Sequence, residues 1–337
     1  MERKTGKTFH EYRLGATLGL TLAIVPGVLS ARPVAAQASS PSPIGFLKPT
    51  SVAGVPRGVN GPIAQLFALI QAKKWGEAAS LAQNLAKSRP GDSMVFYGLG
   101  LTRIQVGNSI GAIQALRSAQ RLGLNTVRLH LALGAAYMTM DQYILFEQQM
   151  QEAMRMSTAN YLPHYYVGRY LESVPNDFAG ALRNFDEATQ LNPEDAKSWY
   201  YKGYCLEVLG RPAEARVAYE TAIRLVTKKG ERLSLPDQGM ARLLAESEPT
   251  QALAYARRAI ALEPGLDSNH FVIAKLYERL GRLPDAITEL QAATRLNPSS
   301  AAPHYVLSRV YTSLGDRKSA RAELSVFEKI NRTYGPE

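Results

Sequence analysis

Residues 197–225 read KSWYYKGYCLEVLGRPAEARVAYETAIRL. Apolar residues recur at helical spacing on both sides of Gly210, which divides the stretch into two amphipathic segments. Gly210 suits the end of the first segment, where a helix commonly needs a residue in the left-handed conformation. Gly203 and Ala215 are small enough to let two helices approach closely. The stretch therefore predicts a helix–turn–helix unit.

Small residues recur along the chain with the period of this unit. Alanines stand about 34 residues apart in one series, and a second series follows it seven residues later. The first series is Ala78, Ala112, Ala181, Ala215, Ala252, Ala286 and Ala320, and the second is Ala119, Ala153, Ala188, Ala222, Ala259 and Ala293. This period is typical of stacked units that cover each other's apolar faces. Eight units fit: 59–92, 93–126, 127–160, 161–195, 196–229, 230–266, 267–300 and 301–334.

Two of these units resemble the tetratricopeptide repeat family most clearly. The fifth matches it at Trp199, Gly203, Leu206, Gly210, Ala215, Tyr219 and Ala222, and the seventh at Ala274, Tyr277, Gly281, Ala286, Leu290, Ala293 and Pro298. The resemblance covers about 59–334. It implies an all-α fold, a right-handed superhelical solenoid of about eight helix–turn–helix repeats. Such stacks usually present a long binding surface rather than a catalytic pocket.

The third unit departs from the pattern. It has Phe146 where the first series has an alanine, and five methionines lie within 138–156. We expect the bulky ring to push the two helices of this unit apart. Methionine fills irregular gaps, so these residues are expected to compensate for the distortion; a soft docking patch is the alternative.

Residues 1–38 have the order of an export signal. A basic start is followed by an uncharged run at 14–31 and then by small residues that predict cleavage before Gln37 or Ser39. The alternative is an uncleaved membrane anchor formed by 14–31, whose length is at the lower limit for spanning a bilayer. Residues 39–58 are rich in Ser, Pro and Gly and are expected to form a flexible linker. We therefore expect an exported protein, periplasmic or secreted.

The composition limits the partners and the sites. Cys205 is the only cysteine, which excludes an intramolecular disulfide and a cysteine-based zinc site. The net charge of +10 favours acidic proteins, anionic glycans or lipid headgroups, although a well-solvated basic surface without specific meaning has the same charge. An exported protein does not normally meet nucleic acid, so no nucleic-acid partner is expected.

No pattern points to catalysis. Four histidines, His130, His164, His270 and His304, occupy the position that Trp199 holds in the fifth unit. Rings at one position of neighbouring repeats lie roughly 10 Å apart, whereas the ligands of one zinc ion lie near ~2 Å from it. No nucleophilic triad and no phosphate-binding glycine motif stands out. We expect packing histidines, no metal, no cofactor and no enzyme.

In the family that the chain resembles, the first helix of each unit lines the inner, concave surface. Aromatic residues recur there, and polar, often basic residues follow four positions later on the same helix face. The aromatic residues are Tyr97, Tyr165, Tyr200, Phe271 and Tyr305, and the later residues are Arg169, Tyr204, Lys275 and Arg309. Such a groove suits peptide segments with acidic and apolar side chains. The alternative is that the rings pack adjacent repeats and never meet a ligand.

The last unit has no following helix to cover Leu324 and Phe327. We expect this end either to pack on itself or to form a homodimer. The predicted function is a non-catalytic interaction scaffold or assembly adaptor of the cell envelope. The alternative is a binding module for anionic envelope polymers or membrane surfaces that uses the basic body. Otherwise, membrane contact is expected only if the N-terminal segment stays uncleaved.

Overall fold

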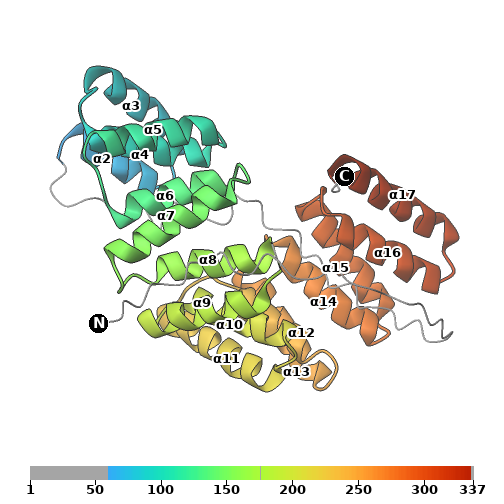
Figure 1. The fold of residues 1–337 in the computed structure, drawn as a ribbon. Helices are drawn as coiled ribbons and strands as arrows, with labels where there is room; N and C mark the ends of the chain where they lie inside the picture. The colour runs from blue at the N-terminus through green and yellow to red at the C-terminus, as the bar shows by residue number, and fades with distance from the viewer. Residues whose placement is uncertain (1–59, 175, 335–337) are drawn as a thin grey trace, which may run out of the picture. The chain divides into compact units, whose positions relative to one another are not determined.

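The computed structural model describes residues 60–174 and 176–334. The chain divides into two units, residues 1–36 and 37–337. The first unit lies outside the described residues, as do the predicted export signal and the linker that follows it. All of the described helices belong to the second unit (Figure 1).

The described residues form sixteen helices and no strand. In pairs, they are α2 (Pro62–Gln71) and α3 (Trp75–Ser88), α4 (Ser93–Gln105) and α5 (Ser109–Arg121), α6 (Val127–Met138) and α7 (Tyr143–Met156), α8 (Leu162–Ser173) and α9 (Phe178–Leu191), α10 (Ala196–Val208) and α11 (Pro212–Lys229), α12 (Leu235–Leu243) and α13 (Pro249–Leu262), α14 (Asp267–Arg279) and α15 (Leu283–Leu296), and α16 (Ala301–Ser313) and α17 (Arg317–Tyr334). Each pair falls within one expected unit, so the all-α solenoid of eight repeats is confirmed. None of these helices has the length and the apolar character needed to cross a membrane.

Small residues bring the two helices of a pair together. A Cβ atom added to Gly203 of α10 would lie 2.7 Å from the ring of Tyr219 and 3.3 Å from the carbonyl oxygen of Ala215, both on α11. Every alanine of the two series is buried. The alanine series therefore marks the lines along which helices touch.

A left-handed residue follows the first helix in most pairs. Gly210, Gly281 and Gly315 have φ angles of 72°, 70° and 79°, as their places in the sequence predict. In three other pairs the same place holds a residue with a side chain: Lys73 (φ 57°), Asp141 (φ 54°) and Asn176 (φ 54°). The turn geometry is thus imposed by the helix pair even where glycine is absent.

The expected separation of the third pair is wrong. Phe146 is fully buried, and α6 and α7 pack as extensively as the other pairs. A Cβ atom added to Gly134 of α6 would lie 2.4 Å from Cε of Met150 and 3.4 Å from the ring of Phe146. A glycine on the facing helix therefore makes room for the ring, and Met150 fills the space beside it.

Consecutive pairs pack on each other chiefly through the second helix of one pair and the first helix of the next, as α3 does on α4 and α9 on α10, and less extensively through their first helices. Helix α4 lies against α6, and α10 lies against α8 and α12, whereas no two second helices among the described pairs are in comparable contact. We call the surface formed by the even-numbered helices α2 to α16 the first-helix face. The surface formed by the odd-numbered helices α3 to α17 is the second-helix face.

Candidate functional site

The nine predicted site residues lie on first helices but differ widely in exposure. Residues four positions apart share a face of α8, α10, α14 and α16. Tyr97, Tyr165, Arg169 and Tyr200 are buried, Tyr204 and Phe271 are half-buried, and Lys275, Tyr305 and Arg309 are exposed. The structure therefore divides the predicted row into a buried N-terminal half and a more accessible C-terminal half.

The buried rings pack between helices. The centroid of the Tyr165 ring lies 6.1 Å from that of Phe185 and 5.9 Å from that of Tyr201. The ring of Tyr200 lies 5.8 Å from that of Tyr219 on α11. Burial raises the pKa of Tyr165 and of Tyr200 above the ordinary value, so both stay protonated near neutral pH. These rings join adjacent helices, which is the alternative role stated above, and their contact with a ligand stays a prediction.

Arg169 is a buried cation with its partners already in place. Its residue is 4 % exposed, and its guanidinium carbon lies 3.9 Å from the centroid of the Tyr201 ring. A desolvated cation over an aromatic face is attracted by the electron-rich ring. Nε of Arg169 also lies 3.3 Å from Oε2 of Glu172. Burial raises the pKa of Glu172, and the charge of Arg169 acts against this shift.

Three glutamates complete the row, and the sequence reasoning missed them. Glu172, Glu207 and Glu278 each stand three positions after a predicted site residue. Nη2 of Arg309 lies 2.6 and 2.7 Å from the two carboxylate oxygens of Glu278, and Nζ of Lys275 lies 3.5 Å from one of them. Residues three apart are neighbours on a helix, so the constant spacing was a signal that could have revealed these carboxylates.

Arg242 of α12 fastens the sixth unit to the fifth. Its Nε and Nη2 donate to the two oxygens of Glu207 over 2.7 and 2.8 Å, and the hydroxyl of Tyr219 donates to Glu207 over 2.7 Å. The guanidinium carbon lies 5.3 Å from the centroid of the Tyr204 ring. Bidentate pairs of this kind are stronger and more directional than single hydrogen bonds, so this contact fixes α12 against α10.

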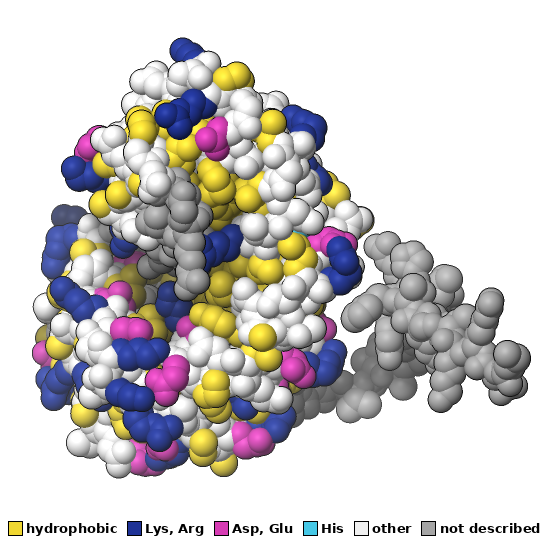
Figure 2. Space-filling model, turned by 90° about the vertical axis from the view of Figure 1, so that its left-hand side faces the viewer, with side chains coloured by type: hydrophobic (Ala, Val, Ile, Leu, Met, Phe, Trp, Pro, Cys, Tyr) yellow, Lys and Arg dark blue, Asp and Glu magenta, His cyan; other side chains and the backbone are white. Residues whose placement is uncertain are grey.

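The charges along this row are therefore nearly balanced. The cations Arg169, Arg242, Lys275 and Arg309 meet the carboxylates Glu172, Glu207 and Glu278. Four positive charges less three negative ones leave a net charge of +1. Figure 2 shows the same mixture on one side of the molecule, where Lys and Arg side chains are interspersed with Asp and Glu. The face presents rings beside paired charges.

Three histidines bond across their own helix pairs. Nδ1 of His130 lies 2.9 Å from Oε1 of Gln149, Nδ1 of His270 lies 2.7 Å from Oε2 of Glu289, and Nδ1 of His304 lies 2.6 Å from Oε2 of Glu323. The partner stands nineteen positions later in each case, so the contact belongs to the repeat and the packing role of these rings is confirmed. Residues 60–174 and 176–334 contain no group of His, Cys, Asp and Glu suited to hold a metal ion.

Models of the tetratricopeptide repeat match residues 176–228 and 243–302. These segments lie within the fourth to eighth helix pairs, which include the fifth and seventh units singled out above. The chain is therefore a tetratricopeptide-repeat protein. Proteins of this class are scaffolds for protein–protein interaction. No curated protein matches the chain by sequence.

Two solved structures share the fold over most of the chain. The APC/C hetero-tetramer Cut9-Hcn1 matches with a TM-score of 0.63 and 13 % identity, covering 76 % of this chain and 50 % of that one. Yeast Tom70 matches with a TM-score of 0.59 and 15 % identity, covering 84 % of this chain and 65 % of that one. The chain thus spans half to two thirds of their lengths. At these identities the likeness concerns the fold alone.

Proposed function

We propose that the chain is a non-catalytic interaction scaffold or assembly adaptor of the cell envelope, which binds peptide segments along its first-helix face. The observation that carries this proposal is the accessible half of the row on α10, α14 and α16. It consists of Tyr204, Phe271, Lys275, Tyr305 and Arg309. Tyrosine and arginine are enriched among the residues that contribute most to protein–protein binding.

The paired charges indicate which peptides fit this face. Arg309 and Lys275 already meet Glu278, so an acidic ligand side chain must share or displace that carboxylate. Burying a charge after its partner is lost costs free energy. A segment with apolar residues and charges of both signs leaves the pairs satisfied. The sequence suggested a ligand with both acidic and apolar residues. For this face, only the apolar residues of such a ligand remain part of the proposal.

Site-specific photo-crosslinking tests the binding face. We place benzoylphenylalanine at Tyr204 and at Tyr305, and at Val217 on α11, which is 60 % exposed. The two first-helix positions are expected to crosslink to the same partner, and the second-helix position is not. If all three positions give the same products, the first-helix face is not the binding surface.

Two matched double variants measure how much the cations of this face contribute to binding. Lys275→Ala with Arg309→Ala removes two cations from the first-helix face, and Arg224→Ala with Arg295→Ala removes two exposed cations from the second-helix face. Only the first pair is expected to weaken binding of the crosslinked partner, by roughly tenfold if each side chain contributes a rim-type contact. Equal loss in both pairs indicates a non-specific charge effect.

We also propose export to the cell envelope, supported by the basic, apolar and small-residue order of 1–38. The intact mass of the protein recovered from its native cells distinguishes the alternatives. Cleavage gives a chain beginning at Gln37 or Ser39. An uncleaved chain recovered with membranes supports the anchor formed by 14–31.

Homodimerisation through the last repeat is a further part of the proposal. Leu324 and Val326 of α17 are 38 % and 39 % exposed, whereas Phe327 already packs on Tyr305 with ring centroids 5.3 Å apart. Light scattering at high protein concentration is expected to give a dimer mass for the wild type and a monomer mass for Leu324→Glu. A monomer mass for both proteins contradicts homodimerisation through the last repeat.

The second candidate function is binding of anionic envelope polymers or membrane surfaces through the basic body. Residues 1–38 hold five Lys/Arg and two Glu, a net +3, so residues 39–337 carry 10 − 3 = +7 of the net charge of +10. The salt dependence of binding distinguishes this candidate function from the first one. Attraction between exposed charges is screened beyond ~8 Å at physiological ionic strength. Polymer binding is therefore expected to fall steeply between low and high salt, and binding anchored by aromatic rings is expected to persist.

A further inference from the structure

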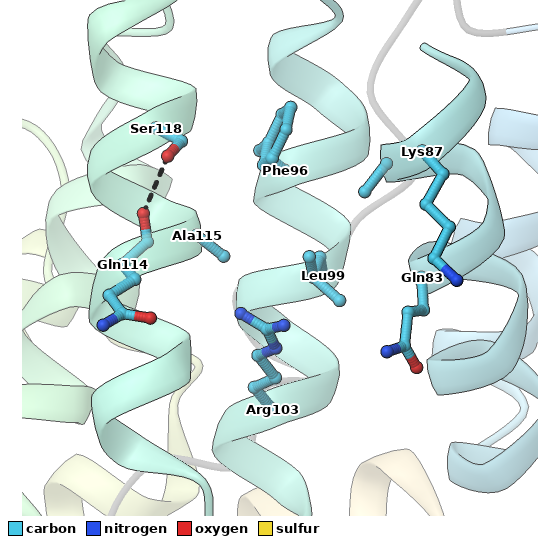
Figure 3. Close-up of a pocket in the computed structure, with 9 residues that line it drawn as sticks. Gln83, Lys87, Phe96, Leu99, Arg103, Gln114, Ala115 and Ser118 are labelled. Carbon is cyan, nitrogen blue, oxygen red and sulfur yellow. Dashed lines mark hydrogen bonds between the residues drawn. The ribbon is translucent and has the colours of Figure 1, made fainter. Parts of the chain in front are cut away.

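A cavity of about 250 Å³ opens between the second helices of the first two helix pairs and is also lined by α4. Figure 3 shows it between α3 and α5, with α4 between these two helices. Phe96 and Leu99 of α4 and Ala115 of α5 give it apolar walls, and Lys87 and Arg103 approach it with their charged ends. It is thus separate from the row of residues on the first-helix face.

A difference between repeats explains why the cavity exists. Ala115 stands nineteen positions after Phe96, the spacing that joins a histidine to its partner in three other pairs. Those partners are long side chains, Gln149, Glu289 and Glu323, and each bonds the ring opposite. In the second pair a methyl group replaces the long partner, so the space beside the Phe96 ring is not filled. The fifth pair also has an alanine at this place, Ala218, but its ring is the larger indole of Trp199.

The charge around the cavity differs from that of the first-helix face. Its lining includes Lys87 and Arg103 but no Asp or Glu. Nη1 of Arg103 donates to the carbonyl oxygen of Gly111 over 2.9 Å, which holds the guanidinium beside the cavity. None of the ion pairs between described residues involves either cation, whereas Lys275 and Arg309 both meet Glu278. These two cations therefore have no carboxylate to compete with an incoming anion.

We propose that this cavity binds an acidic peptide segment of a partner protein, which inserts an apolar side chain beside Phe96 and pairs its carboxylates with Arg103 and Lys87. The size supports a side chain as the occupant, because the volume is below the ~300–1,000 Å³ that is common for small-molecule pockets. Apolar walls with unopposed cations at the edge complement an apolar residue with acidic neighbours. The site thus takes the acidic ligand that the first-helix face is less suited to hold.

The N-terminal part of this chain does not have the required charge. Residues 12–76 contain no Asp or Glu, whereas Lys48 and Arg57 stand within the stretch 39–58. Charge complementarity therefore favours a partner over this segment of the same chain. A second copy of the chain and an anionic lipid surface are distinguished from a peptide in the test.

Fluorescence anisotropy of the purified full chain tests the site. The probe is a labelled dodecapeptide in which glutamates flank two leucines; one control peptide has glutamine for glutamate and another has alanine for leucine. Ala115→Gln introduces the side chain that the third pair has at this position. It is expected to weaken binding of the probe at least tenfold. Arg103→Gln with Lys87→Gln is expected to do the same, and it carries the test if Ala115→Gln does not fold by circular dichroism. Both control peptides are expected to bind at least tenfold more weakly than the probe.

Lys275→Ala with Arg309→Ala is the matched control, because it removes two cations from the first-helix face. This pair is expected to leave the affinity for the probe within twofold of the wild type. Failure of the cavity proposal is therefore distinguishable from failure of the proposed function, which rests on the first-helix face. Unchanged binding in both cavity variants overturns the proposal, as does an equal loss in the control pair. Binding of phosphatidylglycerol vesicles that Ala115→Gln abolishes, without peptide binding, assigns the site to a lipid surface instead. A dimer mass that falls to a monomer mass in Ala115→Gln assigns it to a second copy.

Discussion

Gly203 illustrates how one residue sets the distance between two helices. Replacing glycine by alanine inside a helix ordinarily stabilises it by about 0.5–1 kcal/mol. Here the new methyl group would lie 2.7 Å from the ring of Tyr219, which is fully buried. Overpacking of this kind typically costs about 1–3 kcal/mol, so we expect Gly203→Ala to lower the free energy of unfolding. Urea denaturation measures it, with Gly76→Ala on α3 as the control.

The control has the opposite expected sign. No atom lies within 4 Å of a Cβ atom added to Gly76, so alanine there gains helix propensity without a clash. A small increase in stability for Gly76→Ala beside a loss for Gly203→Ala supports the close approach. Two changes of equal sign contradict it.

Asp237 on α12 is a buried carboxylate that is expected to lower stability at neutral pH. Nε of Arg258 lies 3.0 Å from one of its oxygens, yet neither oxygen accepts a hydrogen bond from the described residues. Burial raises the pKa of Asp237 from 3.8 to about 6, and the charge of Arg258 acts against this shift. The folded state therefore takes up a proton below pH 6, and the unfolded state only near 3.8. Hence this group adds stability as the pH falls through that window.

Asp237→Asn tests this expectation because it removes the charge with little change in shape. The variant is expected to be about 1–3 kcal/mol more stable than the wild type at pH 7.5 and equal to it near pH 4. Denaturation at both pH values measures the difference. A variant that is less stable at pH 7.5 shows that the pair with Arg258 outweighs the cost of burial.

At the scale of the helix pair, the turn after each first helix requires a left-handed residue whether or not glycine is present. Lys73 adopts φ 57° between α2 and α3, where Gly210 and Gly281 serve in other pairs. For a residue with a side chain, this conformation costs roughly 1–2 kcal/mol of conformational free energy. We expect Lys73→Gly to raise the free energy of unfolding by about 1 kcal/mol, measured by urea denaturation. Lys74→Gly, next to it and without positive φ, is expected to be neutral or destabilising.

The period of the alanines predicts these helix pairs because a small residue is needed wherever two helices cross. The same reasoning failed at Phe146, since the space for its ring comes from Gly134 on the facing helix, which a series read along one position does not include. Exposure along the first helices was equally hard to predict. Tyr200 and Tyr305 hold the same repeat position, yet Tyr200 is covered by neighbouring units and Tyr305 lies in the last one.

The charges of the first-helix face depend on contacts between units. Glu278 stands three residues after Lys275, a neighbour that the helix period predicts, but its pairing with Arg309 joins α14 to α16. Single-helix periodicity gives no information on which side chains meet across two repeats. For this reason the sequence predicted the rings and cations of the row and missed the carboxylates that neutralise them.

At the scale of the whole stack, stability is expected to be local because each unit packs only on its neighbours. The described residues show three apolar clusters. The larger core extends from Ile63 to Ala286, the smaller core joins Ala274 and Leu290 to Val306, Leu307 and Val310, and a third cluster consists of Ala196, Leu225 and Val226. The C-terminal end therefore has its own apolar cluster. It also has no helix beyond α17 among the described residues to cover it.

Leu307→Ala is expected to destabilise this end alone. The side chain is 1 % exposed, and truncating a buried leucine costs about 2–5 kcal/mol. Since the lost contacts belong to the smaller core, hydrogen exchange followed by mass spectrometry should show faster exchange in α14 to α17 and unchanged protection in α4 to α7. Leu116→Ala, in the larger core, is the matched control and should loosen α4 to α7 instead. Uniform loss of protection along the chain in both variants would mean that the stack unfolds as one cooperative unit, and that binding at one end responds to damage at the other.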